Sequence, residues 1–400
     1  MKAYRVNSNK QIPPFGEHPL DCLIANRKLA DLQKEVLVEL GLELQLIDNI
    51  SEIPDNDECI IFHDSLYFTK MLLREFIEKS RTLAARTKFA VEPGLLTVKS
   101  IVATQDVRTC SDRIEYNLEY SPAKSLSNNP SPLIIDPDCL AEGVVMPKHM
   151  IGEPKSIVPI TEKVIIQIDH WCNLWAANIG VLLANTAKIA KASKWKLLLL
   201  ALKAHSTNQW KVLHKTNTIG QNCDIHPTAY IEGSIIGDSV TIGAGVVIRQ
   251  SVVGDGANIL NNATIDTSVI GDSSYIGSSS MIQYSVLYPG TFILARVVSL
   301  STTGRDTFLG DNVTLTDFRL DGQNIAVMKD GILIDTGNRL LGPCIGHGVY
   351  LAAGSIVGPG REIRNELRLA PTEERTIRKC KPGVDIEGYR LIQKHIDPLH

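Results

Sequence analysis

Several features that would assign this chain to a common functional class are missing from it. The eight cysteines among its 400 residues form no Cys-x-x-Cys pair, so the sequence indicates neither a zinc ribbon nor a disulfide framework. No apolar run approaches the roughly 20 residues that span a bilayer, and no apolar signal-peptide core follows the first residue. A net charge of −3 argues against the large basic surface of a general nucleic-acid binder. We therefore expect a cytoplasmic protein that binds no nucleic acid.

The second half of the sequence contains a repeat with a period of 17 residues. An aliphatic-glycine pair marks the start of each period: Ile219-Gly220, Ile236-Gly237, Val253-Gly254 and Ile270-Gly271. Each period divides into two units of six residues and one of five, and an aliphatic residue opens every unit. Such a pattern is typical of a solenoid whose short strands stack roughly 4.8 Å apart, with Gly, Asp or Asn allowing positive φ at the corners. Small residues such as Ala229, Val240 and Ala257 fit the narrow interior.

The repeat is interrupted once. An insertion covers about 317–341, and its segment NIAVMKDGILIDTG predicts a β-hairpin that turns at Asp330-Gly331. The remaining sequence divides into three parts. Residues 1–165 alternate predicted strands (MKAYRV, CIIFH) with predicted helices (23–40, 69–80), which favours an α/β domain with a mostly parallel sheet. We assign 166–215 to a helical connector, 216–368 to the solenoid and 369–400 to a C-terminal tail.

The connector has an unusual charge pattern. No acidic residue occurs from His170 to Cys223, whereas seven lysines do: Lys188, Lys191, Lys194, Lys196, Lys203, Lys211 and Lys215. One interpretation is a helix lying on anionic lipid, with Trp195 and the LLLLAL run dipping in. The other is a connector that packs its apolar stripe on the sheet domain or on a neighbouring subunit. The sequence favours the second interpretation, so a membrane is not an expected partner.

The repeat over 219–368 resembles the hexapeptide-repeat acyltransferase superfamily, which implies a left-handed parallel β-helix and a homotrimer. The segments NRKLADLQKEVLVELGLELQLI and ECIIFHDSLYFTKMLLREFIEKS resemble a sugar-phosphate nucleotidyltransferase domain, as in the N-acetylglucosamine-1-phosphate uridyltransferases. That resemblance gives Asp64 the position of an aspartate that helps to hold catalytic Mg²⁺, with His63 in place of a glycine. The loop RVNSNKQIPPFGEHPLDCLIANRK has one glycine and two consecutive prolines, so it cannot wrap a triphosphate in the usual way. We expect a degenerate nucleotidyltransferase-like domain.

Candidate catalytic residues come from the two histidines of the repeat. Hexapeptide-repeat acyltransferases use a histidine as general base, and His347 follows the insertion, where a loop and a coil corner can form a pocket. His226, in the sequence IHPTAY, is the weaker candidate. The alternative for both is a structural or solvated corner histidine. A metal site of the carbonic-anhydrase type needs three converging imidazoles, so no metal is expected.

The resemblance also implies residues that bind substrate. Asp321 and Asn324, in the segment RLDGQN, are candidates for the acyl acceptor, although Asp-Gly is equally a common turn. Arg361 and Arg364 are candidates for phosphates of coenzyme A, with solvent exposure the alternative.

The function that we predict is transfer of an acyl group to a small-molecule amine or hydroxyl acceptor, possibly a sugar nucleotide. Acyl-CoA or an acyl-carrier protein would be the donor, and no cofactor would be permanently bound. One alternative is a non-catalytic trimer whose N-terminal domain binds a ligand or partner. Another is a divergent sugar-phosphate nucleotidyltransferase, and Mg²⁺ belongs to this alternative alone.

Overall fold

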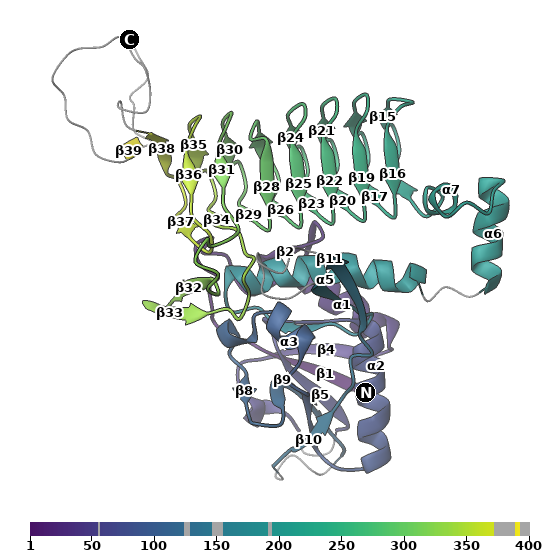
Figure 1. Ribbon diagram of the computed structural model, residues 1–400. Helices are drawn as coiled ribbons and strands as arrows, with labels where there is room; N and C mark the ends of the chain where they lie inside the picture. Colours follow the sequence, from purple (N-terminus) through teal and green to yellow (C-terminus); the bar gives the residue numbers. More distant parts are fainter. Residues whose placement is uncertain (55–56, 124–128, 146–154, 191–193, 372–388, 393–400) are drawn as a thin grey trace. The chain divides into compact units, whose positions relative to one another are not determined.

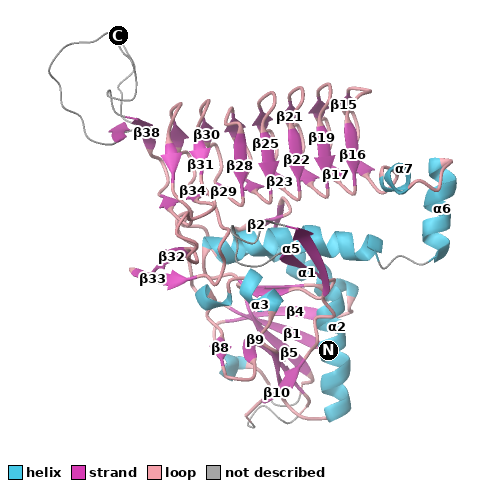
Figure 2. Cartoon of the chain, viewed as in Figure 1, coloured by secondary structure: helices cyan, strands magenta, loops and turns pink. Residues whose placement is uncertain are grey.

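The computed structural model describes residues 1–54, 57–123, 129–145, 155–190, 194–371 and 389–392 (Figure 1). The chain divides into two compact units. The first, the N-terminal unit, comprises Met1–Lys191 together with Lys329–Asn338, and the second comprises Ala192–Met328 with Arg339–His400. Helices and strands mix in the N-terminal unit, whereas the second unit consists mainly of short strands (Figure 2).

The N-terminal unit is built on a mixed sheet with the strand order β10-β7-β9-β5-β1-β4, and β8 pairs with β9. Its strands are β1 (Lys2–Val6), β4 (Glu43–Ile47), β5 (Cys59–His63), β7 (Thr87–Val91), β8 (Arg108–Thr109), β9 (Ile114–Ser121) and β10 (Ser131–Ile134). β1 runs parallel to β4 and β5, whereas β9 runs antiparallel to β5 and β7. The predicted α/β class is confirmed, but the sheet is more mixed than the sequence suggested.

Shorter strand pairs complete this unit. They are β2 (Leu23–Ile24) with β3 (Arg27–Lys28), β6 (Leu66–Phe68) with β13 (Ile165–Gln167), and β11 (Leu140–Val145) with β12 (Lys155–Ile160). The 3₁₀ turns are η1 (Pro19–Asp21), η2 (Ile50–Glu52) and η3 (Val102–Thr104).

Two of the predicted helices form, with shifted boundaries. Helix α2 (Lys70–Leu83) buries Leu72, Leu73, Phe76 and Ile77, which share one helical face. Helix α1 (Leu29–Glu39) begins six residues later than predicted, because Ala25 and Asn26 both have positive φ and turn the chain between β2 and β3. A short helix, α3 (Leu95–Lys99), follows β7.

The predicted connector divides between the two units. Helix α5 (Trp171–Ala190) belongs to the N-terminal unit, where it contacts β2, β12 and β13 and buries most of its apolar residues. The apolar stripe of α5 is therefore covered, as the sequence favoured. Helices α6 (Lys194–Ala204) and α7 (Gln209–Leu213) belong to the second unit. No helix in the described part of the chain is long and apolar enough to cross a membrane.

The second unit is a parallel β-helix with three sheets as its faces, the arrangement of a left-handed hexapeptide-repeat coil. Its strands pair in parallel, except that β39 pairs antiparallel with β38 at the end of the second sheet. The first face contains β14 (Thr218–Ile219), β17 (Ile235–Ile236), β20 (Val252–Val253), β23 (Val269–Ile270), β26 (Val286–Leu287), β29 (Thr302–Thr303), β34 (Cys344–Ile345) and β37 (Glu362–Ile363). The second contains β15 (Asp224–Ile225), β18 (Thr241–Ile242), β21 (Asn258–Ile259), β24 (Tyr275–Ile276), β27 (Phe292–Ile293), β30 (Phe308–Leu309), β35 (Tyr350–Leu351), β38 (Arg368–Pro371) and β39 (Tyr389–Ile392). The third contains β16 (Tyr230–Glu232), β19 (Val247–Arg249), β22 (Thr264–Asp266), β25 (Met281–Gln283), β28 (Val297–Ser299), β31 (Thr314–Leu315) and β36 (Ile356–Val357).

The 17-residue period is visible in the strand pairing. Ile219 pairs with Ile236, which pairs with Val253. Ile236 and Val253 contribute to one continuous core, whereas Ile219, in the first coil, is 48% exposed. Positive φ occurs at corner glycines and asparagines such as Gly245 and Asn262, as predicted, whereas the glycine of an Ile-Gly pair has another role. Gly237 does not have positive φ; a Cβ there would lie 2.3 Å from Oδ1 of Asp255, so close approach of the next coil requires glycine. Positive φ occurs two residues later, at Ser239.

The insertion forms the predicted hairpin. Strands β32 (Ala326–Lys329) and β33 (Ile332–Asp335) pair, and Asp330 and Gly331 between them both have positive φ. Residues Lys329–Asn338 belong to the N-terminal unit, where Nζ of Lys329 donates to the carbonyl of Thr104.

Candidate functional site

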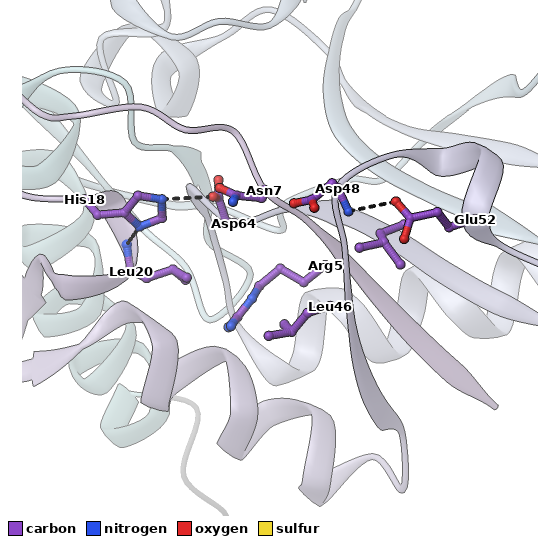
Figure 3. Close-up of a pocket in the computed structure, with 9 residues that line it drawn as sticks. Arg5, Asn7, His18, Leu20, Leu46, Asp48, Glu52 and Asp64 are labelled. Carbon is purple, nitrogen blue, oxygen red and sulfur yellow. Dashed lines mark hydrogen bonds and ion pairs between the residues drawn. The ribbon is translucent and has the colours of Figure 1, made fainter.

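A cavity of about 300 Å³ lies at the carboxyl ends of β1, β4 and β5 (Figure 3). β4 and β5 flank β1 on opposite sides, so the chain changes direction across the sheet at this point. Ligands of open α/β sheets bind at such switch points, outside the carboxyl ends of the strands. The cavity is lined by Arg5, Asn7, His18, Leu20, Leu46, Ile47, Asp48, Glu52 and Asp64.

Asp64 lies at the wall of this cavity, immediately after β5, and its side chain is only 2% exposed. Its backbone N–H donates to the carbonyl of Val6, and its own carbonyl accepts from Nε2 of Gln33. Oδ2 of Asp64 accepts from the backbone N–H of Ser8 at 2.9 Å. Among the residues that the structure describes, the buried Oδ1 atom has no hydrogen-bond partner. A buried carboxylate oxygen without a donor is costly, which makes it a candidate ligand contact.

His18 orients Asp64 from the other side. Nδ1 of His18 accepts from the backbone N–H of Leu20 at 3.3 Å, so the neutral ring carries its proton on Nε2. That Nε2 atom lies 3.3 Å from Oδ2 of Asp64 (Figure 3). Nη1 of Arg5 donates to Oε1 of Gln33 at 3.2 Å, and burial lowers the pKa of Arg5 although Asp64 opposes this effect. The cavity thus combines a guanidinium, an imidazole and carboxylates with apolar walls.

The loop between β1 and His18 hydrogen-bonds largely to itself. The N–H of Ser8 donates to Oδ2 of Asp64, and the N–H of Asn9 donates to Oδ1 of Asn7. The N–H of Ile12 donates to the carbonyl of Glu17, and that of Gly16 to the carbonyl of Ile12. Pro13 and Pro14 have no N–H to offer. These four N–H groups and the two prolines are therefore not available to cradle a triphosphate.

The lysine of this loop is also engaged. Nζ of Lys10 lies 2.7 Å from both Oδ2 of Asp106 and Oδ1 of Asp169, and the Asp169 side chain is 2% exposed. The N–H of Asp106 donates to Oδ2 of Asp169 at 2.6 Å. Although burial opposes protonation, the two hydrogen bonds prevail and raise the pKa of Lys10, so this lysine stays charged. Lys10 is therefore an internal cation that ties the loop to two carboxylates.

His347 lies at a corner of the β-helix between β34 and β35. Its Nδ1 accepts from the backbone N–H of Arg305 at 2.8 Å, and its own N–H donates to Oδ1 of Asn365 at 2.8 Å. Asp and Asn side chains make the same bond elsewhere, as Asp255 does for the N–H of Asp238. His347 therefore takes the place of an Asp or Asn in an inter-coil ladder. Its neutral ring has the Nε2 proton, which is not the tautomer of a base acting through Nε2.

The other predicted residues of the β-helix lie at its surface. His226 is exposed, with Nδ1 2.9 Å from Oγ1 of Thr228. Arg361 and Arg364 are exposed on either side of β37. Asp321 pairs with Arg319, whose guanidinium lowers the pKa of Asp321 to about 2, and Asn324 follows in the same loop. Asp321 is therefore engaged within its own turn, and the catalytic and binding roles of all these residues stay predictions.

Sequence reasoning found Asp64 but missed His18, Arg5 and Asp169. His18 is 46 residues from Asp64 in the sequence, and only the fold brings them together. A usable signal was the order strand, irregular loop, helix around Arg5–Leu29, which places loop residues at the carboxyl edge of the sheet. Among the described residues no group of three His, Cys, Asp or Glu side chains could hold a metal ion. Asp64 alone could hold Mg²⁺ only together with substrate phosphates.

Comparisons with known proteins concern the β-helix. Residues 209–330 match the family model described as the GMPPB C-terminal domain, which is hexapeptide-like and of the nucleotidyltransferase family. No curated protein matches. The crystal structure of a hexapeptide transferase family protein from Anaplasma phagocytophilum is similar at 20% identity and a TM-score of 0.20, over 39% of this chain and 80% of that one. That structural likeness carries no functional argument.

The coil geometry and the family match define the second unit as a hexapeptide-repeat β-helix similar to the GMPPB C-terminal domain. The match concerns 209–330 alone, and it specifies neither a donor nor an acceptor.

Proposed function

We propose that the N-terminal unit binds a nucleotide sugar or a sugar phosphate in the cavity at the carboxyl ends of β1, β4 and β5, without nucleotidyl transfer. The observation that carries this proposal is the buried carboxylate of Asp64. One of its oxygens is held by Ser8 and His18, and the other lacks a donor among the described residues. A sugar or ribose hydroxyl is a donor of the right size and polarity.

The rest of the cavity suits the other parts of such a ligand. Arg5 and His18 are the cationic or donor groups that a phosphate needs. Leu20 and Leu46 offer apolar surface for a base or for the face of a sugar ring. A volume of about 300 Å³ accommodates a small phosphorylated ligand, or part of a nucleotide sugar with the remainder in solvent.

Nucleotidyl transfer is the less well supported activity. It requires preorganised donors that stabilise the developing charge on a triphosphate. Here the N–H groups of Ser8, Asn9, Ile12 and Gly16 already have acceptors, and Lys10 is engaged by Asp106 and Asp169. We therefore assign the cavity a binding role, and pyrophosphate release from UTP with Mg²⁺ is expected to stay at the background rate.

Titration calorimetry of the full chain with UDP-N-acetylglucosamine, GDP-mannose and glucose 1-phosphate tests the proposal. At least one of these probes is expected to bind. His18→Ala and Asp64→Asn should each weaken binding at least about tenfold, because each removes a hydrogen bond with a charged partner. His226→Ala, at an exposed histidine of the other unit, is the matched control. Binding of none of the probes, or equal affinity in all variants, would refute the proposal.

A second candidate is acyl transfer by the β-helix, from acyl-CoA or an acyl-carrier protein to a small amine or hydroxyl acceptor. A cluster of side chains at the corner of His347 favours it. The His347 ring stacks on Tyr288 at 5.9 Å, and the Arg305 guanidinium lies 5.1 Å from the Tyr288 ring. In acyl transfer the imidazole would serve the acceptor as a general base, and the guanidinium would attract the anionic groups of the acyl donor. In this candidate Asp321 and Asn324 bind the acceptor, and Arg361 and Arg364 bind phosphates of the donor.

His347→Asn separates a catalytic role from a structural one. Asparagine can accept the hydrogen bond from Arg305, as other ladder residues do, but it cannot act as a general base. If His347 is the base, turnover of acetyl-CoA with an amine acceptor should fall about 10²- to 10⁴-fold while the melting temperature stays unchanged. Undiminished turnover in this variant would remove His347 from the mechanism.

We further propose a homotrimer, for which sedimentation equilibrium should give three times the 43.9 kDa chain mass.

A further inference from the structure

Helix α6, which precedes α7 and the first coil of the β-helix (Figure 1), carries an exposed apolar stripe. The stripe, named here the α6 stripe, consists of Trp195, Leu198, Leu199 and Leu202. These positions follow the spacing of one helical face. Their exposed fractions are 76%, 48%, 58% and 61%, respectively. The interpretation of this segment as a connector that packs its apolar stripe on the sheet domain or on a neighbouring subunit holds for α5, and for the α6 stripe it stays a prediction.

A helix of this length needs a surface to lie on. α6 has 11 residues, and isolated helices shorter than about 12–15 residues are marginal in water. Most helical stability in proteins comes from burying an apolar face. Among the described elements, the one that α6 contacts most is the short α7. Four large apolar side chains in water thus indicate a partner surface.

The charge around the stripe indicates what that surface is. No acidic residue occurs from His170 to Cys223. The lysines of this segment include Lys203 on α6, Lys211 on α7 and Lys215 just beyond it, and all three are exposed. A helix with a tryptophan and leucines on one side and nearby lysines is typical of a helix in the plane of an anionic membrane interface.

A second copy of the chain fits this surface less well. Two α6 stripes packed face to face would bring the lysines of both copies together. The segment contains no acidic residue that could neutralise them. Like charges at such a contact are destabilising, whereas anionic lipid headgroups supply the missing negative charge. The helix is about 16 Å long, so it can lie on a bilayer but not cross it.

We propose that α6 docks on an anionic lipid surface, with the α6 stripe inserted among the acyl chains and the lysines facing the headgroups. Docking would hold the protein at a membrane without a spanning segment. The proposal is independent of the ligand in the N-terminal cavity.

Flotation of the full chain with phosphatidylcholine vesicles, with and without roughly one-third phosphatidylserine, tests the proposal. The chain should float with the phosphatidylserine vesicles, and raising the salt from about 0.1 M to about 0.5 M should release it. Tryptophan emission should shift to the blue on binding, and Trp195→Phe should reduce that shift. Trp171 and Trp175 are already buried, and Trp210→Phe measures what the tryptophan of α7 contributes.

Two variants separate the contributions of the stripe and the charge. The double variant Leu199→Gln/Leu202→Gln should weaken vesicle binding at least about tenfold, because it removes two inserted side chains. Lys203→Glu/Lys211→Glu should weaken it at least about fivefold for each lysine. Leu333→Gln, at a leucine of β33 that is 55% exposed, and Lys34→Glu, at an exposed lysine of α1, are the matched controls and should float like the wild type.

Three results would overturn the proposal. Absence of flotation with anionic vesicles would do so directly. Self-association without lipid that Leu199→Gln/Leu202→Gln abolishes would assign the stripe to a contact between copies. Saturable binding to polyglutamate, combined with no binding to vesicles, would assign the segment to an acidic protein partner.

Discussion

The two units treat their buried polar groups differently. In the β-helix a serine recurs at one corner, and each buried hydroxyl accepts from the N–H of the next coil. Ser251 accepts from Ser268 at 3.1 Å, and Ser268 accepts from Ser285 at 3.0 Å, while each also donates to a carbonyl two residues earlier. In the N-terminal unit, Asp64 is equally buried, but its Oδ1 has no partner among the described residues.

This difference indicates where ligand chemistry is concentrated. At the serine corner, repetition satisfies a polar group in one coil with the equivalent group in the next, so this corner has little capacity left for a ligand. Elsewhere in the coil, Oγ of Ser280 and Oγ1 of Thr302 also lack a partner among the described residues. The aperiodic N-terminal unit can keep a carboxylate oriented and unsatisfied, at a cost in stability, for a ligand to complete. Four predictions test this contrast, beginning with the largest effect.

Ser268→Ala should destabilise the β-helix by about 1–3 kcal/mol, because it leaves the buried N–H of Ser285 without its acceptor. Chemical denaturation monitored by circular dichroism measures this change. Ser278→Ala, at an exposed serine of a neighbouring corner, is the control and should lie within about 0.5 kcal/mol of the wild type. Equal stability of the two variants would mean that the ladder does not stabilise the coil.

Asp64→Asn should have the opposite effect in the N-terminal unit. It keeps an acceptor for the N–H of Ser8 but removes a buried charge, so the free energy of unfolding should stay unchanged or rise by about 1 kcal/mol. Ligand affinity should fall in the same variant. The melting temperature with and without nucleotide sugar measures both effects. A clear loss of stability would show that the carboxylate is part of the structural core rather than a binding group.

The sequence predicts the β-helix far better than the cavity, for a physical reason. The period fixes the position of every aliphatic residue, so Ile236, Ile242 and Ile248 are all buried as expected. The hairpin at Asp330-Gly331 and the strand that precedes Asp64 were predictable too, because turn chemistry and apolar runs are local signals. Contacts between His18 and Asp64 depend on which strands become neighbours, which no local pattern specifies.

Misjudged details follow the same rule. The repeat does not reveal why glycine follows the aliphatic residue: at Gly237 it is the neighbouring coil that excludes a Cβ. The ladder role of His347 was open in the sequence, because one histidine among aspartates and asparagines does not reveal which atom it will bond. The sequence predicts one connector, and only the structure shows that α5 buries its apolar residues whereas the α6 stripe is exposed.

The pH dependence of stability should also differ between the units. Burial lowers the pKa of His63 below its ordinary value of 6.5, although the nearby carboxylates of Asp64 and Asp169 oppose this effect. The unfolded chain therefore takes up a proton at His63 before the folded chain does. The neutral His63 side chain therefore contributes its full share to the free energy of unfolding above about pH 6.5. As the pH falls below that value, the free energy of unfolding should decrease. His63→Asn should reduce this pH dependence, whereas His226→Asn, at an exposed imidazole of the β-helix, is the control. An unchanged profile in His63→Asn would assign the dependence to other groups.

The smallest expected effect on stability concerns His347. His347→Ala removes the acceptor for the N–H of Arg305 and should cost about 1 kcal/mol. His347→Asn should restore stability to within about 0.5 kcal/mol of the wild type, because Asn261 already accepts the equivalent hydrogen bond from Ala244. If the asparagine variant is instead as unstable as the alanine variant, the stacking of the ring on Tyr288 must provide the stabilisation. The position would then require an imidazole rather than any ladder acceptor. In that case the β-helix, too, would have a position that its repeat does not explain. That position is the predicted base for acyl transfer, so the two units would differ less than their buried polar groups suggest.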